Sequence, residues 1–203
     1  MRPDTLGVVL AGGLARRMGG GDKPLRPLAG RPMLAHVLER LAPQVAAVVI
    51  NANGAPGRFP ACGLAVGAAG AAGPAGPLAG VLAALDFAAE RRDCAWVVSV
   101  PGDSPLIPPD LAARLHAARA AAGVPLACAR SGGFAHPPVG LWPVGLREDL
   151  RAALLAGERK IDRWTARHGC AEVEWPTVPC DPFFNANTPE ELAEAEALLH
   201  AGA

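Results

Sequence analysis

Short apolar runs alternate with longer amphipathic stretches along most of the chain. Apolar runs of strand length predict β-strands at residues 6–10, 45–50, 63–66, 95–100, 124–128 and 138–142. Helical periodicity is expected at 32–41, 78–89, 111–121 and 146–155, and in a last helix that starts near residue 188. Prolines flank the strand expected at 138–142, which favours an edge position for it.

The alternation of strands and helices predicts an α/β fold. We expect a mainly parallel sheet with helices on both faces, in a single domain that spans residues 1–203. The stretch 67–80 is rich in glycine, alanine and proline, and it is interpreted as a long loop inside this domain. The last helix begins with Thr188-Pro-Glu-Glu191, which matches a capping box with proline at the first helical position.

A glycine-rich loop follows the first expected strand. It reads Leu10-Ala-Gly-Gly-Leu-Ala-Arg-Arg-Met-Gly-Gly-Gly-Asp-Lys23. Glycine lets backbone N–H groups approach an anion closely, and Arg16, Arg17 and Lys23 add positive charge. The spacing matches neither a Walker-type P-loop nor a dinucleotide fingerprint. The loop therefore predicts a binding site for a nucleoside triphosphate, although a plain turn between strand and helix is the alternative.

Two further polar residues follow expected strands. Asn51 follows the strand at 45–50, and Asp103 follows the strand at 95–100. In parallel sheets ligands bind beyond the carboxyl ends of the strands, so we expect both residues to lie beside the glycine-rich loop. A lone carboxylate suits Mg²⁺, which binds through one or two carboxylates plus substrate phosphates. Asp103 is therefore the expected metal ligand, with a turn or capping role as the alternative. Asp22 is either the second acidic group of this site or a residue that only orders the loop.

Asparagine is used sparingly in this chain. All four asparagines lie in two Asn-Ala-Asn triplets, at 51–53 and 185–187. Asparagine tolerates left-handed turns and offers both a donor and an acceptor. Turns elsewhere in the chain use glycine and proline, so the triplets indicate binding residues more than simple turns.

These motifs together resemble the molybdenum cofactor guanylyltransferases, a family with a Rossmann-like nucleotidyltransferase fold. The resemblance covers most of the chain, and its segments lie at 10–23, 48–53, 76–80, 103–111, 136–137, 157–160 and 185–192. The ending Asn-Ala-Asn-Thr-Pro-Glu-Glu-Leu is the narrowest of these signatures. The family transfers GMP from Mg-GTP to molybdenum bound by molybdopterin and releases pyrophosphate. The resemblance implies the same reaction here, with GTP and a molybdopterin-type cofactor as substrates and Mg²⁺ as the metal.

The resemblance also implies roles for individual residues. The N-terminal part would bind the nucleotide through Leu10, Ala11, Gly12, Gly13, Lys23, Asn51 and Asp103. Catalysis would depend on Lys23, Asp103 and Arg17, and Asp103 would also bind Mg²⁺. The C-terminal part would face the pterin substrate through Asn185 and Asn187.

One departure from the family concerns the guanine base. The family usually carries a carboxylate after the third strand, but residues 59–85 contain no acid, and Ala69 occupies the nearest aligned position. Base recognition would then depend on backbone groups. A cytidylyltransferase for the same cofactor is the nearest alternative, although such enzymes more often have Ala-Ala-Gly where this chain has Ala11-Gly-Gly13. A protein that only binds the cofactor is a second alternative, and the presence of Lys23 and Asp103 argues against it.

Composition excludes several other classes. Lysine plus arginine equals aspartate plus glutamate at 19 each, so nucleic acid is not an expected partner. No apolar run is long enough to span a membrane, and no signal peptide is evident, so a cytoplasmic protein is expected. The five cysteines contain no C-x-x-C pair and are interpreted as reduced thiols. His136 either lines the acceptor pocket or is structural. Proteins that insert or chaperone the finished cofactor are further candidate partners.

Overall fold

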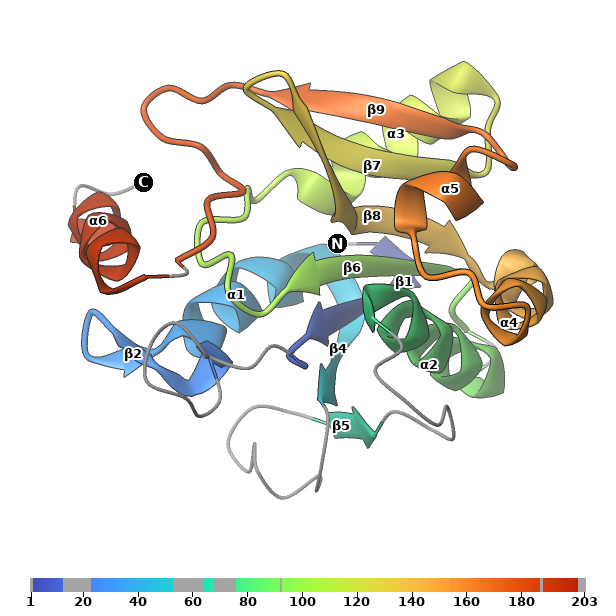
Figure 1. The fold of residues 1–203 in the computed structure, drawn as a ribbon, viewed down its shortest axis with the longest axis horizontal. Helices are drawn as coiled ribbons and strands as arrows, with labels where there is room; N and C mark the ends of the chain where they lie inside the picture. The colour runs from blue at the N-terminus through green and yellow to red at the C-terminus, as the bar shows by residue number, and fades with distance from the viewer. Residues whose placement is uncertain are drawn as a thin grey trace.

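The computed structural model describes residues 2–12, 23–52, 64–67, 76–91, 93–186 and 188–200. Its main feature is a seven-stranded sheet in the order β5-β4-β1-β6-β8-β7-β9 (Figure 1). The strands are β1 (Arg2–Leu10), β4 (Val45–Ala52), β5 (Leu64–Gly67), β6 (Trp96–Pro101), β7 (Leu126–Ser131), β8 (Phe134–Pro143) and β9 (Cys170–Trp175). A separate small hairpin pairs β2 (Pro27–Leu28) with β3 (Arg31–Pro32).

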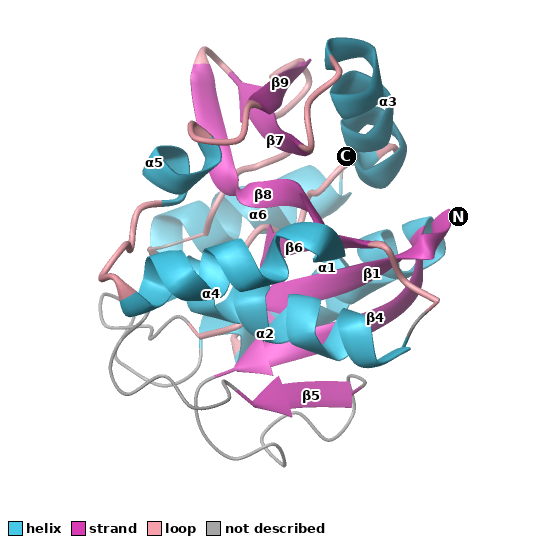
Figure 2. Ribbon diagram, turned by 90° about the vertical axis from the view of Figure 1, so that its right-hand side faces the viewer, coloured by secondary structure: helices cyan, strands magenta, loops and turns pink. Residues whose placement is uncertain are grey.

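Helices cover both faces of the sheet, as the alternation of elements predicts. The α-helices are α1 (Met33–Leu41), α2 (Gly76–Arg91), α3 (Leu111–Ala122), α4 (Arg147–Leu155), α5 (Ile161–Thr165) and α6 (Pro189–His200). Apolar residues of α1 and α3 pack in one core cluster, and those of α2, α4 and α5 pack in another. Figure 2 shows α2 and α4 in front of the sheet and α1 behind it. Three short 3₁₀ helices complete the described elements: Lys23–Leu25, Ala42–Gln44 and Val144–Leu146.

The sheet is parallel except for β8, which runs antiparallel to both of its neighbours. From β1 the chain goes outward to β4 and β5, and then α2 returns it to β6 on the other side of β1. The strand order therefore reverses at β1 and β6. In open α/β sheets this reversal opens a crevice at the carboxyl ends of the strands, which is where the sequence places its candidate residues.

The structure corrects the expected position of one strand. The segment 138–142 belongs to β8, which lies between β6 and β7 and is not an edge strand. Pro137 and Pro138 are tolerated because the register against β7 jumps from Cys128↔Gly140 to Ala129↔His136. Pro137 and Pro138 lie inside this irregularity, where no ladder N–H is needed.

Some elements are not evident from the sequence pattern. Strand β9 forms one edge of the sheet with alternating buried and exposed side chains, and it was not expected because its apolar residues are interrupted by Glu172 and Glu174. The short helix α5 and the β2–β3 hairpin were also not expected. The stretch 67–80, interpreted as a loop, already contains the start of α2 at Gly76; residues 68–75 lie outside the described part of the chain.

The capping box at the start of α6 is confirmed. The Glu191 N–H donates to Thr188 Oγ1 at 3.2 Å, and the Thr188 N–H donates to Glu191 Oε2 at 3.0 Å. These reciprocal bonds satisfy two backbone donors that the first turn leaves without helical partners. They also fix where α6 begins, two positions after the end of the second asparagine triplet. None of the helices in the described part of the chain is long and apolar enough to cross a membrane.

Candidate active site

A partly buried ion pair lies where the strand order reverses. Lys23 begins the first 3₁₀ helix and is 6% exposed, and Asp103 lies in the turn directly after β6. The Lys23 Nζ donates to Asp103 Oδ2 at 2.5 Å. A buried ammonium group is costly without a compensating charge, and the Asp103 carboxylate, whose side chain is 25% exposed, provides it. The glycine-rich loop thus ends against the turn that carries the candidate metal ligand.

Backbone hydrogen bonds join the three strand ends around this pair. The Ala11 N–H donates to the Asn51 carbonyl at 2.7 Å, and the Gly102 N–H donates to the Leu10 carbonyl at 3.0 Å. Asn51 is 7% exposed at the end of β4. The residues predicted after three separate strands therefore do meet at one edge of the sheet, as the parallel topology requires.

Gly80 permits helix α2 to approach this edge. A Cβ at Gly80 would lie 2.7 Å from Asn51 Oδ1 and 2.7 Å from Leu10 Cδ2. Neither distance is compatible with an ordinary van der Waals contact, so any side chain there would displace Asn51 or Leu10. Gly80 is not among the site residues that the sequence predicts. The feature that could have indicated it is the segment Gly-Pro-Leu-Ala-Gly at 76–80, which places two glycines at the start of a helix.

The second asparagine triplet contacts the same turn from the other side. The Ser104 Oγ donates to Asn185 Oδ1 at 2.7 Å, and the Ala186 N–H reaches the Asp103 carbonyl at 3.4 Å. Figure 1 shows the loop after β6 and the segment that leads into α6 running together on one side of the sheet. Asn185 therefore lies beside Asp103, although 82 positions separate them in the numbering.

His136 lies at the same edge, at the start of β8. Its Nε2 is 2.7 Å from Ser131 Oγ, and that hydroxyl donates to Asp181 Oδ1 at 2.8 Å. A serine hydroxyl has one proton, so Ser131 must accept from His136, which then carries its proton on Nε2. Burial lowers the pKa of His136, and Asp181 and Glu174 oppose this more weakly.

The His136 ring also contacts the segment that leads to the second triplet. Its centroid lies 4.9 Å from that of Phe183, and Phe183 comes two residues before Asn185. The Phe183 N–H in turn donates to Asp181 Oδ1 at 2.9 Å. These contacts fix the His136 ring beside the segment that leads to Asn185.

Several candidate residues lie outside the described part of the chain. These are Gly13, Arg16, Arg17, Asp22, Asn53, Ala69 and Asn187. The structure brings together the described candidates from the two parts of the chain, namely Leu10, Ala11, Lys23, Asn51, Asp103 and Asn185. Gly12 directly follows Ala11 at this edge and is partly buried.

The residues present fit a magnesium ion that binds together with a nucleotide. Among the described residues no group of three His, Cys, Asp or Glu side chains forms a metal cage. Mg²⁺ does not require such a cage, because it keeps waters and uses one or two carboxylates plus substrate phosphates. Asp103 offers a partly exposed carboxylate of this kind, with Lys23 held on one of its two oxygens.

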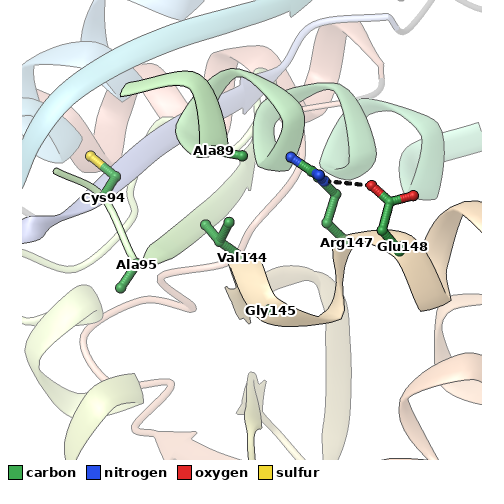
Figure 3. Close-up of a pocket in the computed structure, with 7 residues that line it drawn as sticks. All are labelled: Ala89, Cys94, Ala95, Val144, Gly145, Arg147 and Glu148. Carbon is green, nitrogen blue, oxygen red and sulfur yellow. Dashed lines mark hydrogen bonds and ion pairs between the residues drawn. The ribbon is translucent and has the colours of Figure 1, made fainter. Parts of the chain in front are cut away.

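A cavity of about 500 Å³ lies elsewhere. It is lined by residues that precede β6 and follow β8, including Cys94 and Gly145. Because β8 is antiparallel to β6, these residues lie at the opposite edge of the sheet from Asp103. Figure 3 shows Arg147 in this cavity, paired with Glu148. We therefore do not assign the candidate chemistry to this cavity.

The comparisons with known proteins show which family the chain belongs to. Residues 7–173 match the MobA-like NTP transferase domain. The chain belongs to this family. The match begins in β1 and extends through the Lys23 and Asp103 segments to β9.

Two curated relatives share most of the sequence. A molybdenum cofactor guanylyltransferase of Rhodopseudomonas palustris (strain BisB5) is 58% identical over 198 residues, which cover 97% of this chain and 94% of the relative. Another of the same name, from Bradyrhizobium sp. (strain ORS 278), is 60% identical over 194 residues, covering 95% and 92%.

Among solved structures, the molybdopterin-guanine dinucleotide biosynthesis protein A of Archaeoglobus fulgidus has a similar fold. It superposes with a TM-score of 0.73 at 24% identity, over 97% of this chain and 99% of that one. This similarity confirms the α/β fold that the sequence predicts.

Proposed function

We propose that this MobA-like transferase moves GMP from Mg-GTP to the molybdenum–molybdopterin cofactor, forming molybdopterin guanine dinucleotide and pyrophosphate. The observation that carries the proposal is the Lys23–Asp103 pair at the point where the strand order reverses. Relatives that are 58% and 60% identical over nearly the whole chain are named for this activity. That similarity supports GTP over CTP and supports an enzyme over a binding protein.

The transfer requires no nucleophile from the protein. An oxygen of the acceptor's phosphate attacks the α-phosphorus of GTP. The new P–O bond forms as the bond to the β-phosphate's bridging oxygen breaks, and pyrophosphate leaves with that electron pair. Catalysis then depends on positioning the two phosphates and on neutralising the charge that develops.

The chain's own residues divide this work. Lys23 places a fixed positive charge at the phosphates, and the backbone at Leu10 to Gly13 approaches the nucleotide. Asn51 joins the nucleotide half, and Arg17 adds a second cation for the leaving pyrophosphate. Asp103 would hold Mg²⁺, which when bound supplies further charge neutralisation at the phosphates. Asn185 and Asn187 would contact the pterin substrate.

The surroundings of the reaction follow from the same proposal. We place the enzyme in the cytoplasm as a single domain, where proteins that chaperone or insert the cofactor would receive its product. Cys94, Cys128, Cys170 and Cys180 are free thiols, and free thiols fit a reducing compartment.

A direct assay tests the proposal. The protein is incubated with molybdenum–molybdopterin, Mg²⁺ and one of GTP, CTP or ATP, and both pyrophosphate and the dinucleotide product are measured. We expect product with GTP, and a smaller preference over CTP than in relatives that keep the carboxylate replaced by Ala69, because a wrong base leaves fewer buried polar groups unpaired. A preference for CTP would establish the cytidylyltransferase alternative. Cofactor binding without pyrophosphate from any nucleotide would establish the binding protein.

A further inference from the structure

Ser104 links the two halves of the candidate site. It directly follows Asp103, it is 1% exposed, and its Oγ donates to Asn185 Oδ1 at 2.7 Å. The backbones of the same two segments also meet, through the bond between the Ala186 N–H and the Asp103 carbonyl. The turn with Asp103, the candidate metal ligand, therefore holds the segment with Asn185, the candidate residue for binding the acceptor substrate.

The Ser104 bond determines which end of the Asn185 amide faces the hydroxyl. A half-turn of an asparagine amide exchanges its accepting oxygen for its donating nitrogen, and only the hydrogen-bond network distinguishes the two orientations. A buried hydroxyl without a partner is costly, so Ser104 favours the orientation in which Oδ1 accepts its proton. Asn185 then meets other groups through its N–H donors, which suit the oxygens of an anionic phosphate.

We propose that Ser104 is a positioning residue for the phosphate-bearing acceptor. It acts by holding the Asn185 amide in the donor orientation and by holding residues 185–186 against the Asp103 turn. This inference rests on the proposed function, in which Asn185 belongs to the acceptor half. Ser104 itself touches neither substrate in this proposal.

The test uses equilibrium binding and steady-state kinetics on the full chain. Binding of molybdenum–molybdopterin is titrated in the presence of Mg²⁺ and a non-hydrolysable GTP analogue, and binding of Mg-GTP is titrated separately. The variants are Ser104→Ala, Ser104→Cys, Ser104→Thr, Asn185→Ala and the double variant Ser104→Ala with Asn185→Ala. Ser104→Cys keeps the shape but replaces a strong donor with a weak one, while Ser104→Thr keeps the hydroxyl.

We expect Ser104→Ala and Ser104→Cys to weaken cofactor binding about tenfold, the loss of roughly one hydrogen bond. The affinity for Mg-GTP should change less than about twofold, and Ser104→Thr should restore most of the cofactor affinity. In the Asn185→Ala background, Ser104→Ala should have little further effect on cofactor affinity, because the amide that it orients is gone. Melting temperatures of all variants show whether a loss comes from unfolding.

Two results with the variants would overturn the positioning role. One is cofactor affinity unchanged in both Ser104→Ala and Ser104→Cys. The other is an effect of Ser104→Ala that is equally large with and without Asn185, which indicates a general structural role. The proposed function fails separately, if the parent binds both substrates but releases no pyrophosphate; the binding cycle then still decides the role of Ser104. A parent that does not bind the cofactor overturns both.

Discussion

Lys23 and Asp103 are 80 residues apart in the sequence, and their side chains form an ion pair with Nζ 2.5 Å from Oδ2. The pair joins the end of the glycine-rich loop to the turn after β6, across the reversal of strand order. Because the lysine is almost fully buried, its position is fixed before any substrate arrives. A preorganised charge of this kind is most effective at stabilising charge that develops in a transition state.

Replacement of Lys23 by alanine should remove most of the transfer activity. We expect kcat/KM for GTP to fall by about 10²–10³-fold, because charge on the phosphates is no longer neutralised. The free energy of unfolding should fall by about 1–3 kcal/mol, because the Asp103 carboxylate loses its buried partner. The measurements are pyrophosphate release and urea denaturation. The control is Arg31→Ala, which removes an exposed cation paired with Glu39 and should change neither quantity measurably.

Near-normal turnover in folded Lys23→Ala would remove this lysine from the mechanism. An activity loss that disappears under stabilising conditions, such as added osmolyte, would reduce its role to stability.

Asp103→Asn should weaken the use of Mg²⁺ more than the binding of the molybdenum cofactor. The amide keeps the shape of the side chain but not the charge that attracts a hard cation. The Mg²⁺ concentration for half-maximal activity should rise at least about tenfold. Asp93→Asn is the matched control, because Asp93 is an exposed partner of Arg91. Overlapping Mg²⁺ titrations of parent and Asp103→Asn would show that Asp103 is a structural turn residue.

The parts of the fold with a local signal were predictable from the sequence. The buried strands around β1 and β6 are continuous apolar runs, and the capping box at Thr188 shows where α6 begins. The meeting of Asn51 and Asp103 at one edge follows from parallel topology alone. Two glutamates alternate with apolar residues in β9, so this strand has no continuous apolar run. It is recognisable only from its pairing with β7.

Other features of the site depend on tertiary contacts that no local pattern encodes. The prolines around 138–142 predict an edge strand, but Pro137 and Pro138 lie in a register shift against β7, which only the paired strands show. The contact of Ser104 with Asn185 joins two segments that are 81 residues apart. The need for glycine at position 80 follows only from the packing of α2 on Asn51 and Leu10.

Gly80→Ala tests this close packing. The alanine Cβ would meet Asn51 Oδ1 and Leu10 Cδ2 at 2.7 Å each. Asn51 and Leu10, which we propose bind the nucleotide, must therefore shift. Overpacking costs about 1–3 kcal/mol, and the better helix propensity of alanine offsets about 1 kcal/mol of that loss. We expect a clear rise in KM for GTP with a small net loss of stability. Gly145→Ala is the control, because a Cβ there meets nothing within 4 Å; equal kinetics in the two variants would contradict the steric role of Gly80.

Asn51→Ala separates the nucleotide half of the site from the acceptor half. Asn51 lies beside the Ala11 backbone, which donates to its carbonyl. Loss of its side-chain amide should raise KM for GTP about tenfold, with little change in the affinity for the molybdenum cofactor. Asn185→Ala should give the reverse pattern. Isothermal titration with each substrate distinguishes the two, and GTP affinity lost in Asn185→Ala but kept in Asn51→Ala would show that the halves are assigned the wrong way round.

His136 predicts a pH dependence of stability. Burial lowers its pKa in the folded protein below the ordinary value of 6.5. Between the folded pKa and 6.5 the unfolded chain therefore binds more protons than the folded one, so the free energy of unfolding falls as the pH drops through this window. Above the window the ring is neutral in the folded and in the unfolded protein, so the histidine adds no pH dependence there.

His136→Asn should reduce the loss of stability that the parent shows on acidification from pH 7.5 to 5.5, measured by urea denaturation at several pH values. The free energy at pH 7.5 should also fall, because Ser131 loses its donor while Asp181 keeps the Ser131 proton. His200→Asn is the control, since His200 is exposed at the end of α6 and its replacement should leave the pH profile unchanged. A His136→Asn profile that runs parallel to the parent's would show that other groups cause the acid sensitivity, and that the burial of His136 does not.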